Sequence, residues 1–437
     1  MNSVNEISLG FNKRIKINFD GGDLTSDAGL LLYKEFDDKI GLTEMIQSSV
    51  ILNDSVEHTV HTNESVIVQK IYQHIAGYHA DDHADSLKHD PALTTILEKE
   101  RLASQPTMSR VNQLFDKTAM KQLQQVNNQF IERVHTLEAP ENIVLDLDST
   151  NAATYGLQQG SAYNTHYGEN GYHPMLMFDG LTGDCLKAEL RGGSVYTSRQ
   201  VVRFVGPTLK RFKSIYPWID PLIRGDSGFA IPELFELGEA KESHYVIRLK
   251  SNKRLTTQAE GLLKQIPDDI LEKKTVFYRE FNYQAKSWTK SRRVIVKMEK
   301  PADELLFRFS FIVTSLHLAP KNIAKIYFNR GTMENFIKEG KLGFAFGKMT
   351  SSEFDRNACK LQIAVLAYNL HNGCSRICFP KGMDHKLIDT IRLQFIKVAG
   401  KVIRSGRYLL FKLSSHCVYQ KEFFEALRRI QALPRFG

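Results

Sequence analysis

The stretch "ENIVLDLDST", residues 141–150, decides the fold, because it is the first short apolar and β-branched run after a long helical region. A run of this kind that ends in turn residues is typical of a strand. Residues 172–190 then read as two more strands joined by the turn "GLTGD". The next segments read as a helix, a strand, a helix and a strand, at residues 198–216, 221–228, 231–241 and 244–250. The predicted order βββαβαβ indicates an open α/β sheet with an antiparallel edge.

The regions outside this core have their own patterns. Residues 25–135 carry apolar side chains at three- and four-residue intervals, which predicts a helical region. Residues 252–317 alternate apolar and polar positions and are predicted to be wholly strands, so an inserted domain is expected there. Helices are expected to resume at residue 321, and the chain closes with a basic, apolar segment.

Composition limits the class of protein. The 437 residues include 58 Lys and Arg against 49 Asp and Glu, which gives a net charge of +9, the sign expected of a surface that meets phosphates or anionic lipid. Apolar runs stay well below the roughly 20 residues of a membrane span, and the first 22 residues lack the apolar stretch of a signal peptide. Five scattered cysteines favour a reducing cytoplasm over a disulfide framework.

Two features of the helical region have an ordinary and a functional interpretation. The segment "SQPTMSRVNQLF" predicts a capped short helix from which Arg110 projects; it could enter a DNA groove or lie in a helical bundle. Histidines and aspartates gather in "HIAGYHADDHADSLKHD", residues 74–90, but their spacing fits no standard zinc site. A solvated loop is the favoured interpretation of that segment.

Carboxylates at predicted strand ends are the candidates for chemistry. Asp146 and Asp148 lie on one face of the first strand, because side chains alternate, and Asp226 ends a later core strand. Ligand sites of open α/β sheets form at such ends. Mg²⁺ accepts a few carboxylates and leaves room for phosphate oxygens, and two such ions can drive phosphodiester chemistry. Each aspartate could equally be a turn residue.

A third carboxylate lies in "YFNRGTMENFIKEGK", residues 327–341. If the segment is one helix, Tyr327, Arg330, Glu334 and Lys341 share a face. Periodicity alone favours a solvated face with charge pairs, and Gly331 is a possible helix break.

Together these motifs resemble the DDE transposases of bacterial insertion sequences, in the group with a Tyr-x2-Arg-x3-Glu-x6-Lys signature. Tyr327, Arg330, Glu334 and Lys341 match that signature without a gap. "LDLDST" matches the segment of the family's first Asp, "IRGDSGF" its second, and the group carries a β-rich insertion before its Glu. The residue directly before the Ser-Thr pair matches best, so we choose Asp148 over Asp146.

The resemblance implies a ribonuclease-H-like catalytic core in which Asp148, Asp226 and Glu334 are catalytic and hold two Mg²⁺ ions, with Mn²⁺ as a substitute. Tyr327, Arg330 and Lys341 would bind DNA phosphates near the cut. Trp288 or Tyr283 of the insertion could stack on a displaced base, although core packing is the commoner role of such residues. His173 or Glu169 could support the site.

The implied domains are a mainly helical DNA-binding domain, the core in two pieces, the β-rich insertion and a C-terminal basic segment. Their expected bounds are 1–137, 138–251 with 318–375, 252–317 and 376–437. The implied partners are the inverted-repeat ends of the element and target DNA, bound by a dimer in a synaptic complex in the bacterial cytoplasm, associated with the nucleoid and not with a membrane.

Three functions remain open at this point. The first is a transposase that cleaves the ends of its element and joins the 3′ ends to target DNA. The second is a ribonuclease-H-like nuclease or resolvase that cuts without joining. The third is a DNA-binding derivative that has lost its chemistry, against which the three intact acidic positions argue.

Overall fold

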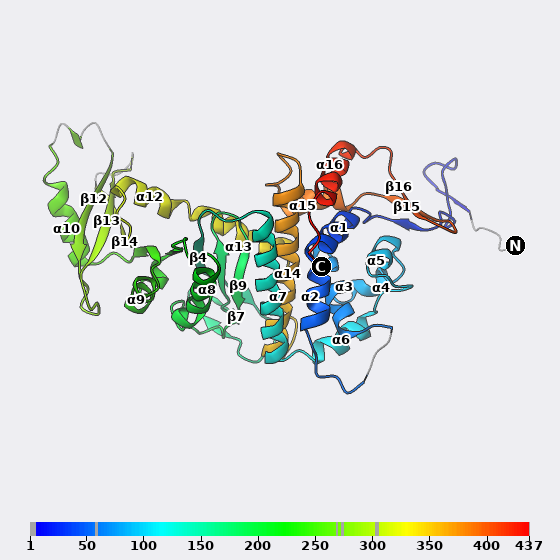
Figure 1. The fold of residues 1–437 in the computed structure, drawn as a ribbon, viewed down its shortest axis with the longest axis horizontal. Coiled ribbons are helices and arrows are strands. Elements are labelled where there is room, and N and C mark those ends of the chain that lie inside the picture. Colours follow the sequence, from blue (N-terminus) through cyan, green and yellow to red (C-terminus); the bar gives the residue numbers. More distant parts are fainter. Residues whose placement is uncertain (1–5, 57–59, 268–269, 272–274, 302–305, 437) are drawn as a thin grey trace. The chain divides into compact units, whose positions relative to one another are not determined.

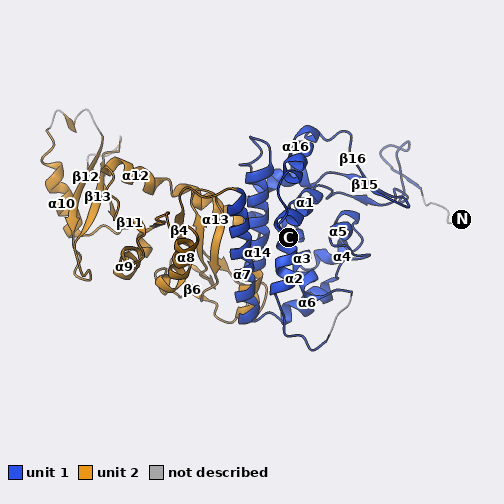
Figure 2. Ribbon diagram, viewed as in Figure 1, with its two compact units in different colours: residues 1–137, 342–345, 362–437 blue, residues 138–341, 346–361 orange. Residues whose placement is uncertain are grey.

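The chain forms two compact units in the computed structural model, which describes residues 6–56, 60–267, 270–271, 275–301 and 306–436. Unit 1 comprises residues 1–137, 342–345 and 362–437, and unit 2 comprises residues 138–341 and 346–361 (Figure 2). Helices and one large sheet both contribute to the fold (Figure 1), so the mixed helix-and-sheet class predicted from the sequence is confirmed.

Unit 1 is built mainly from helices with one buried face each. On α1 (Leu30–Ile40), the buried side chains include Leu32, Tyr33, Phe36 and Ile40, at helical spacing. This helix ends at Gly41, whose φ of 79° suits glycine and stops the helix. The other helices before residue 138 are α2 (Leu42–Ser49), α3 (Asn63–Ala76), α4 (His83–Ser86), α5 (Pro91–Ile96), α6 (Gln105–Gln113) and α7 (Lys117–Leu137).

The C-terminal part of the chain belongs to unit 1 as well. After α14 (Phe354–Cys378), which begins in unit 2 and ends in unit 1, the elements are α15 (Ile388–Ile391), the π-helical turn η2 (Arg392–Ile396), β15 (Gly400–Arg404), β16 (Leu409–Leu413) and α16 (Gln420–Gln431). Strand β15 pairs with β3 (Leu24–Thr25) near the other end of the chain. This pairing makes residues 376–437 part of the same unit as residues 1–137. A separate hairpin joins β1 (Ile7–Ser8) and β2 (Lys16–Ile17).

Unit 2 is organised around an eight-stranded sheet with the order β12-β13-β14-β11-β10-β4-β8-β9. The bounds along the chain are β4 (Val144–Ser149), β8 (Met175–Asp179), β9 (Cys185–Glu189), β10 (Leu222–Gly225), β11 (His244–Leu249), β12 (Val276–Tyr283), β13 (Arg292–Glu299) and β14 (Arg308–Thr314). The first three of these strands pair antiparallel, and β10 and β11 run parallel to β4. The carboxyl ends of β4 and β10 therefore meet at one edge of the sheet.

Helices and short strands complete unit 2. They are the small sheet β5 (Ala152–Ala153), β6 (Ala162–Asn164) and β7 (Glu169–Tyr172), with α8 (Val201–Ile215), the 3₁₀ turn η1 (Ser227–Phe229), α9 (Pro232–Ala240), α10 (Lys253–Leu263), α12 (Pro320–Phe328) and α13 (Gly331–Gly343). Helix α12 buries Ile323 and Ala324 against Val246 of β11 and Ile295 of β13, so it packs on the extended part of the sheet.

Two local expectations differ from the structure. Residues 252–317 were predicted as an insertion made wholly of strands, but they contain α10, and their strands continue the core sheet because β14 pairs antiparallel with β11. Residues 327–341 also do not form the one helix that would place the four signature residues on a single face: α12 ends at Phe328 and α13 begins at Gly331. Asn329 and Arg330 form a hydrogen-bonded turn between the two helices, called the corner from here on.

Candidate active site

Asp148 and Asp226 lie at the carboxyl ends of two adjacent parallel strands. The last paired residues of β4 and β10 are Leu147 and Gly225. Asp148 directly follows Leu147, and Asp226 directly follows Gly225. Asp148 Oδ1 accepts a hydrogen bond from Ser149 N at 2.8 Å, and Asp226 Oδ1 accepts one from Gly228 N at 2.8 Å. The backbone thus fixes one oxygen of each carboxylate.

Arg330 supplies positive charge at these carboxylates. Its Nη2 lies 2.9 Å from Asp148 Oδ2 and also donates to the carbonyl of Leu147 at 3.1 Å. Burial works against the charge of this guanidinium, but Asp148 and Asp226 outweigh burial and raise the pKa of Arg330. The corner between α12 and α13 is what carries Arg330 to this edge of the sheet.

Burial also perturbs Asp148. It raises the pKa of Asp148 from 3.8 to about 6; Arg330 opposes this shift, and the neighbouring charge of Asp226 adds to it. Two carboxylates that repel each other in a buried place are a site that gains from a cation. Their oxygens are the ligands that Mg²⁺ prefers, so the donor set fits this ion.

Asp146 has a different role from its neighbour. It is fully buried, and both its oxygens accept hydrogen bonds from the guanidinium of Arg224 on β10. A Cβ at Gly180 would lie 2.4 Å from Asp146 Oδ2 and 2.6 Å from Arg224 Nη2, so only glycine leaves room for this pair. Asp146 is therefore occupied by an internal ion pair, and Asp148 is the open carboxylate of β4.

Glu334 lies in the first turn of α13 and is exposed. It follows Arg330 by four residues, about one helical turn. Across the part of the chain that the structure describes, no group of three or more His, Cys, Asp or Glu side chains is close enough to hold a metal ion. The structure thus brings Asp148 and Asp226 together, and it leaves Glu334 outside their immediate cluster.

The other two signature residues, Tyr327 and Lys341, have different surroundings within unit 2. Lys341 Nζ donates to Thr150 Oγ1 at 3.3 Å, just past the end of β4, and burial lowers the pKa of this lysine. Tyr327 is only 7% exposed and packs in the core cluster with Ile323 and Val246. Its ring is thus mainly a packing group.

Three residues beside the aspartates escaped the sequence reasoning. Thr197 Oγ1 lies 3.2 Å from Ser149 Oγ, and the Tyr167 hydroxyl donates to the carbonyl of Ser149 at 3.3 Å. Arg191 holds the loop that carries Thr197, because its Nη1 donates to the Thr197 carbonyl at 3.0 Å and its Nε to the His173 carbonyl at 3.0 Å. A lone Arg between a strand and a Gly-Gly pair, in "ELRGGS", was the available signal.

The two supporting groups predicted beside the site have local partners. His173 is buried, and its Nδ1 lies 2.7 Å from the carbonyl of Val195. Glu169 accepts a hydrogen bond from the side chain of Asn151. Both side chains therefore brace the loops next to the end of β4.

Trp288 and Tyr283, the proposed stacking residues, are buried. Their rings meet edge to face with centroids 5.5 Å apart, and Trp288 also packs edge to face on Phe235 and beneath Arg292. This arrangement leaves Trp288 no exposed face for a base. DNA stacking by Trp288 stays a prediction.

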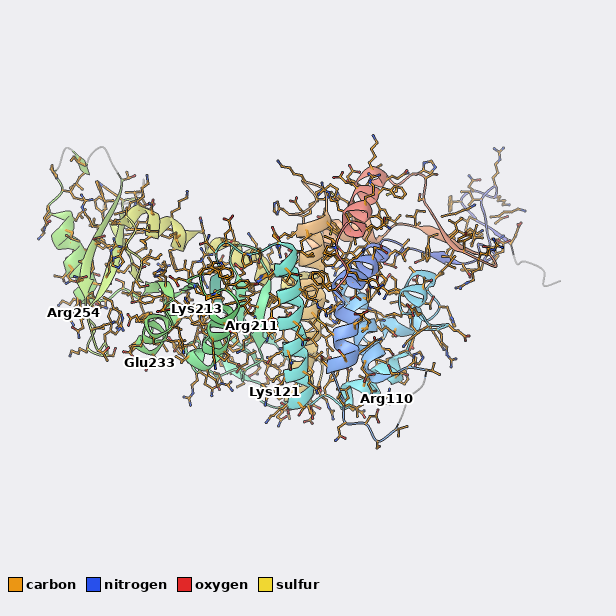
Figure 3. The ribbon with its side chains drawn as sticks, in the orientation of Figure 1. Arg110, Lys121, Arg211, Lys213, Glu233 and Arg254 are labelled. Carbon is orange, nitrogen blue, oxygen red and sulfur yellow. The ribbon has the colours of Figure 1, made fainter. Side chains whose placement is uncertain are left out.

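Arg110 and the histidine-rich segment lie in unit 1. Arg110 Nη1 forms an ion pair with Asp54 Oδ2 at 2.7 Å and a hydrogen bond with Asn63 Oδ1 at 2.9 Å (labelled in Figure 3). His74 is buried, its Nδ1 lies 3.2 Å from His79 Nδ1, and burial lowers the pKa of His74 to about 3. Both features are parts of the helical packing of unit 1.

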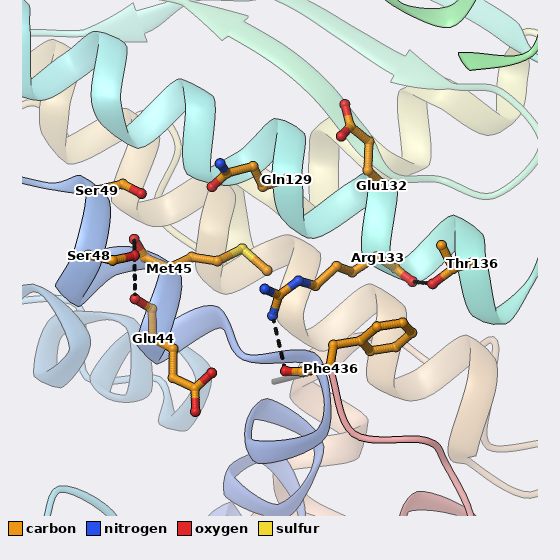
Figure 4. Close-up of a pocket in the computed structure, with 9 residues that line it drawn as sticks. All are labelled: Glu44, Met45, Ser48, Ser49, Gln129, Glu132, Arg133, Thr136 and Phe436. Carbon is orange, nitrogen blue, oxygen red and sulfur yellow. Dashed lines mark hydrogen bonds between the residues drawn. The ribbon is translucent and has the colours of Figure 1, made fainter.

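A separate hollow of about 490 Å³ lies in unit 1 between α2 and α7 (Figure 4). Its lining includes Glu44, Gln129 and Arg133, and the carbonyl of Phe436 accepts a hydrogen bond from Arg133. None of the residues proposed for catalysis lines it.

Every helix in the described ranges is too short or too polar to cross a bilayer.

A family model described as "Transposase DDE domain group 1" matches residues 7–435. Among solved structures, the chain is similar to a piggyBac transposase synaptic complex with hairpin DNA, with a TM-score of 0.41 and 14% identity over 85% of this chain and 80% of that chain. No curated protein matches the sequence.

Proposed function

Since the chain belongs to the DDE transposase family, group 1, we propose that it binds the inverted-repeat ends of a bacterial insertion sequence, cleaves DNA there and joins the 3′ ends to target DNA. We also propose that residues 138–251 and 318–375 form a ribonuclease-H-like core. The order β9-β8-β4-β10-β11, with three antiparallel strands followed by two parallel ones, supports that core.

One observation carries the proposal: Asp148 and Asp226 end adjacent parallel strands and share the cation of Arg330. With Glu334 they would hold two Mg²⁺ ions, or Mn²⁺, which activate a nucleophile and stabilise the leaving oxygen in phosphodiester chemistry. Glu334 lies in the first turn of α13, four residues after Arg330, and we propose that a rearrangement of α13 on DNA binding adds its carboxylate to the pair.

The chain's own residues position the substrate. Lys341, next to Thr150, is placed to neutralise a DNA phosphate at the end of β4. Arg330 balances the charge of the two carboxylates, and its guanidinium would be available to a phosphate if a bound cation took over that balance. Tyr327, which packs in the core at the end of α12, holds the corner in place. We propose that the protein acts on DNA as a dimer, because the two ends of the element must be held together. We also propose that it acts at the nucleoid.

The first test separates transposase from nuclease. Purified full chain, Mg²⁺, a duplex carrying one element end and a target plasmid should give both cleavage and joined products. Asp226→Ala should bind the duplex as the wild type does and neither cut nor join, because one of two adjacent metal ligands is lost. Cleavage without joining would identify a nuclease, and equal cleavage by the variant would refute the two-metal assignment.

Glu334 has a matched control. Glu334→Gln should abolish cleavage, whereas Glu233→Gln should leave it unchanged, because Glu233 is also an exposed acid in the first turn of a helix of unit 2 (labelled in Figure 3). Loss of activity in both variants would show a general charge effect. Full activity of Glu334→Gln would remove Glu334 from the metal site and leave the two aspartates.

A further inference from the structure

The hairpin formed by β15 and β16 lies outside the chemistry described above. Residues 400–413, called the C-terminal ribbon from here on, pair antiparallel from Gly400–Leu413 to Arg404–Leu409. Strand β3 pairs only with Gly400 and Lys401. Val402 N also donates to the carbonyl of Asp23 at 2.8 Å. Beyond Val402, no third strand among the described residues pairs with the C-terminal ribbon.

The segment around the C-terminal ribbon is free of acidic residues. Between Asp389 and Glu422 the sequence has seven Lys and Arg and no Asp or Glu. Four of these cations lie in the ribbon and are exposed: Lys401, Arg404, Arg407 and Lys412. Arg404 has Asp23 at 3.8 Å, and the other three form no ion pair with any described residue. The rest of unit 1 thus leaves this charge uncompensated.

One face of the C-terminal ribbon concentrates the unpaired charge. Lys401 is directly opposite Lys412, and on the same face Ile403 is opposite Leu410, with 38% and 50% of these two apolar side chains exposed. Like charges on directly opposed positions destabilise a hairpin. A face that combines opposed lysines with exposed aliphatic side chains is therefore better suited to an anionic partner than to water.

We propose that the C-terminal ribbon binds duplex DNA, with Lys401 and Lys412 on the phosphates and Ile403 and Leu410 against the groove wall. The inference rests on the proposed function, which supplies duplex DNA as the partner. The major groove admits a two-stranded β-ribbon, and Lys and Arg on phosphates set register without reading sequence. Tyr408, 74% exposed at the turn of the ribbon, would contact the sugar or base edges.

The test compares two double variants of the full chain. Lys401→Ala with Lys412→Ala should weaken binding of a labelled duplex in Mg²⁺-free buffer by about 10- to 30-fold near 0.1 M salt, and lower the slope of log K against log salt by about 2. Lys117→Ala with Lys121→Ala removes the same charge from the exposed side of α7 in the same unit and should change affinity much less (Lys121 in Figure 3).

A conservative variant checks that charge, and not folding, is responsible. Lys401→Arg with Lys412→Arg should bind as the wild type does, and circular dichroism should show that no variant unfolds at a lower temperature than the wild type. An unchanged affinity and salt slope in the alanine variant would overturn the inference, while Mg²⁺-dependent cutting by the wild type would leave the proposed function standing.

Two further outcomes separate the inference from its premise. If the wild type sediments with phosphatidylserine vesicles and the alanine variant loses that binding while keeping its DNA affinity, the C-terminal ribbon is a membrane contact and the inference is wrong. If the wild type neither binds nor cuts duplex DNA, the proposed function fails, and the inference fails with it.

Discussion

Strand β4 carries one aspartate in its middle and another at its carboxyl end, on the same face, and the two have different surroundings. Asp146 is fully buried, with both oxygens bound to Arg224. Asp148, two residues later, shares Arg330 with Asp226 at the edge of the sheet. Position along the strand thus decides whether an aspartate stabilises the fold or remains available to a ligand.

The difference shows how two acidic residues close together in a sequence can take different roles, one in the stability of the fold and one in binding a ligand. A carboxylate with a dedicated guanidinium has its charge balanced and its lone pairs occupied. A carboxylate whose cation is shared with a second acid keeps a shortage of positive charge, which a divalent ion can fill. The three predictions below test that division.

The largest effect should come from the end of the strand. Asp148→Asn should lower the rate of DNA cleavage by about 10⁴-fold, roughly 5 kcal/mol of barrier, because an amide is a poor ligand for a hard cation. Measured under the same conditions, a folded Asp146→Asn protein should still cut. Cleavage that survives in Asp148→Asn and vanishes in Asp146→Asn would reverse the comparison.

In the middle of the strand, the effect should be on stability. Asp146→Asn should lower the free energy of unfolding by about 3 to 5 kcal/mol, because it leaves the buried Arg224 without its counter-ion. Denaturant titration measures this change. Asp146→Leu combined with Arg224→Met should be less destabilised than Asp146→Asn, since no charge is then left unpaired; a larger loss in the double variant would contradict the ion-pair explanation.

The smallest of the three effects depends on pH. With the folded-state pKa of Asp148 raised from 3.8 to about 6, the folded protein holds this proton more tightly, so wild type loses stability as pH rises from about 4 to 7. Relative to Asp148→Asn, the loss between pH 4 and pH 7 should be about 2 kcal/mol in buffer with EDTA. Thermal unfolding at pH 4 and pH 7 measures it, and equal differences at both values would contradict it.

Added Mg²⁺ provides the control for that pH dependence. At pH 7 the ion should raise the unfolding temperature of the wild type, because it binds the folded state and compensates the two carboxylates. Asp226→Ala should show a much smaller rise. An equal rise in both proteins would mean that the ion binds elsewhere.

The aspartates could be located from sequence because they depend on local patterns. Short apolar runs ending at Asp148 and at Asp226 placed both residues at strand ends, and the structure puts those ends next to each other. The choice between Asp146 and Asp148 rested on the resemblance. Only the packing of Arg224 and the absence of a side chain at Gly180 show what Asp146 does.

Features that depend on distant partners could not be predicted. The strands of residues 252–317 alternate as any half-buried strands would, and nothing local announces that β14 joins β11. Gly331 indicated a possible break in the helix, but the local sequence does not show that Asn329 and Arg330 leave it or that Arg330 reaches Asp148. Thr197 approaches Ser149 across 48 residues of chain, a contact that no local period encodes.

The contacts of the Arg224 guanidinium affect the order in which parts of the chain fold during synthesis. Besides Asp146, it donates to the carbonyl of Ile326 at 2.6 Å, and its partners lie 78 residues before it and 102 residues after it. Contacts of such separation close late during folding. On the ribosome, β4 must wait for β10, and both must wait for α12. We therefore expect nascent chains to lack the corner that presents Arg330 and Glu334, so that cutting begins only once synthesis is well past the core strands.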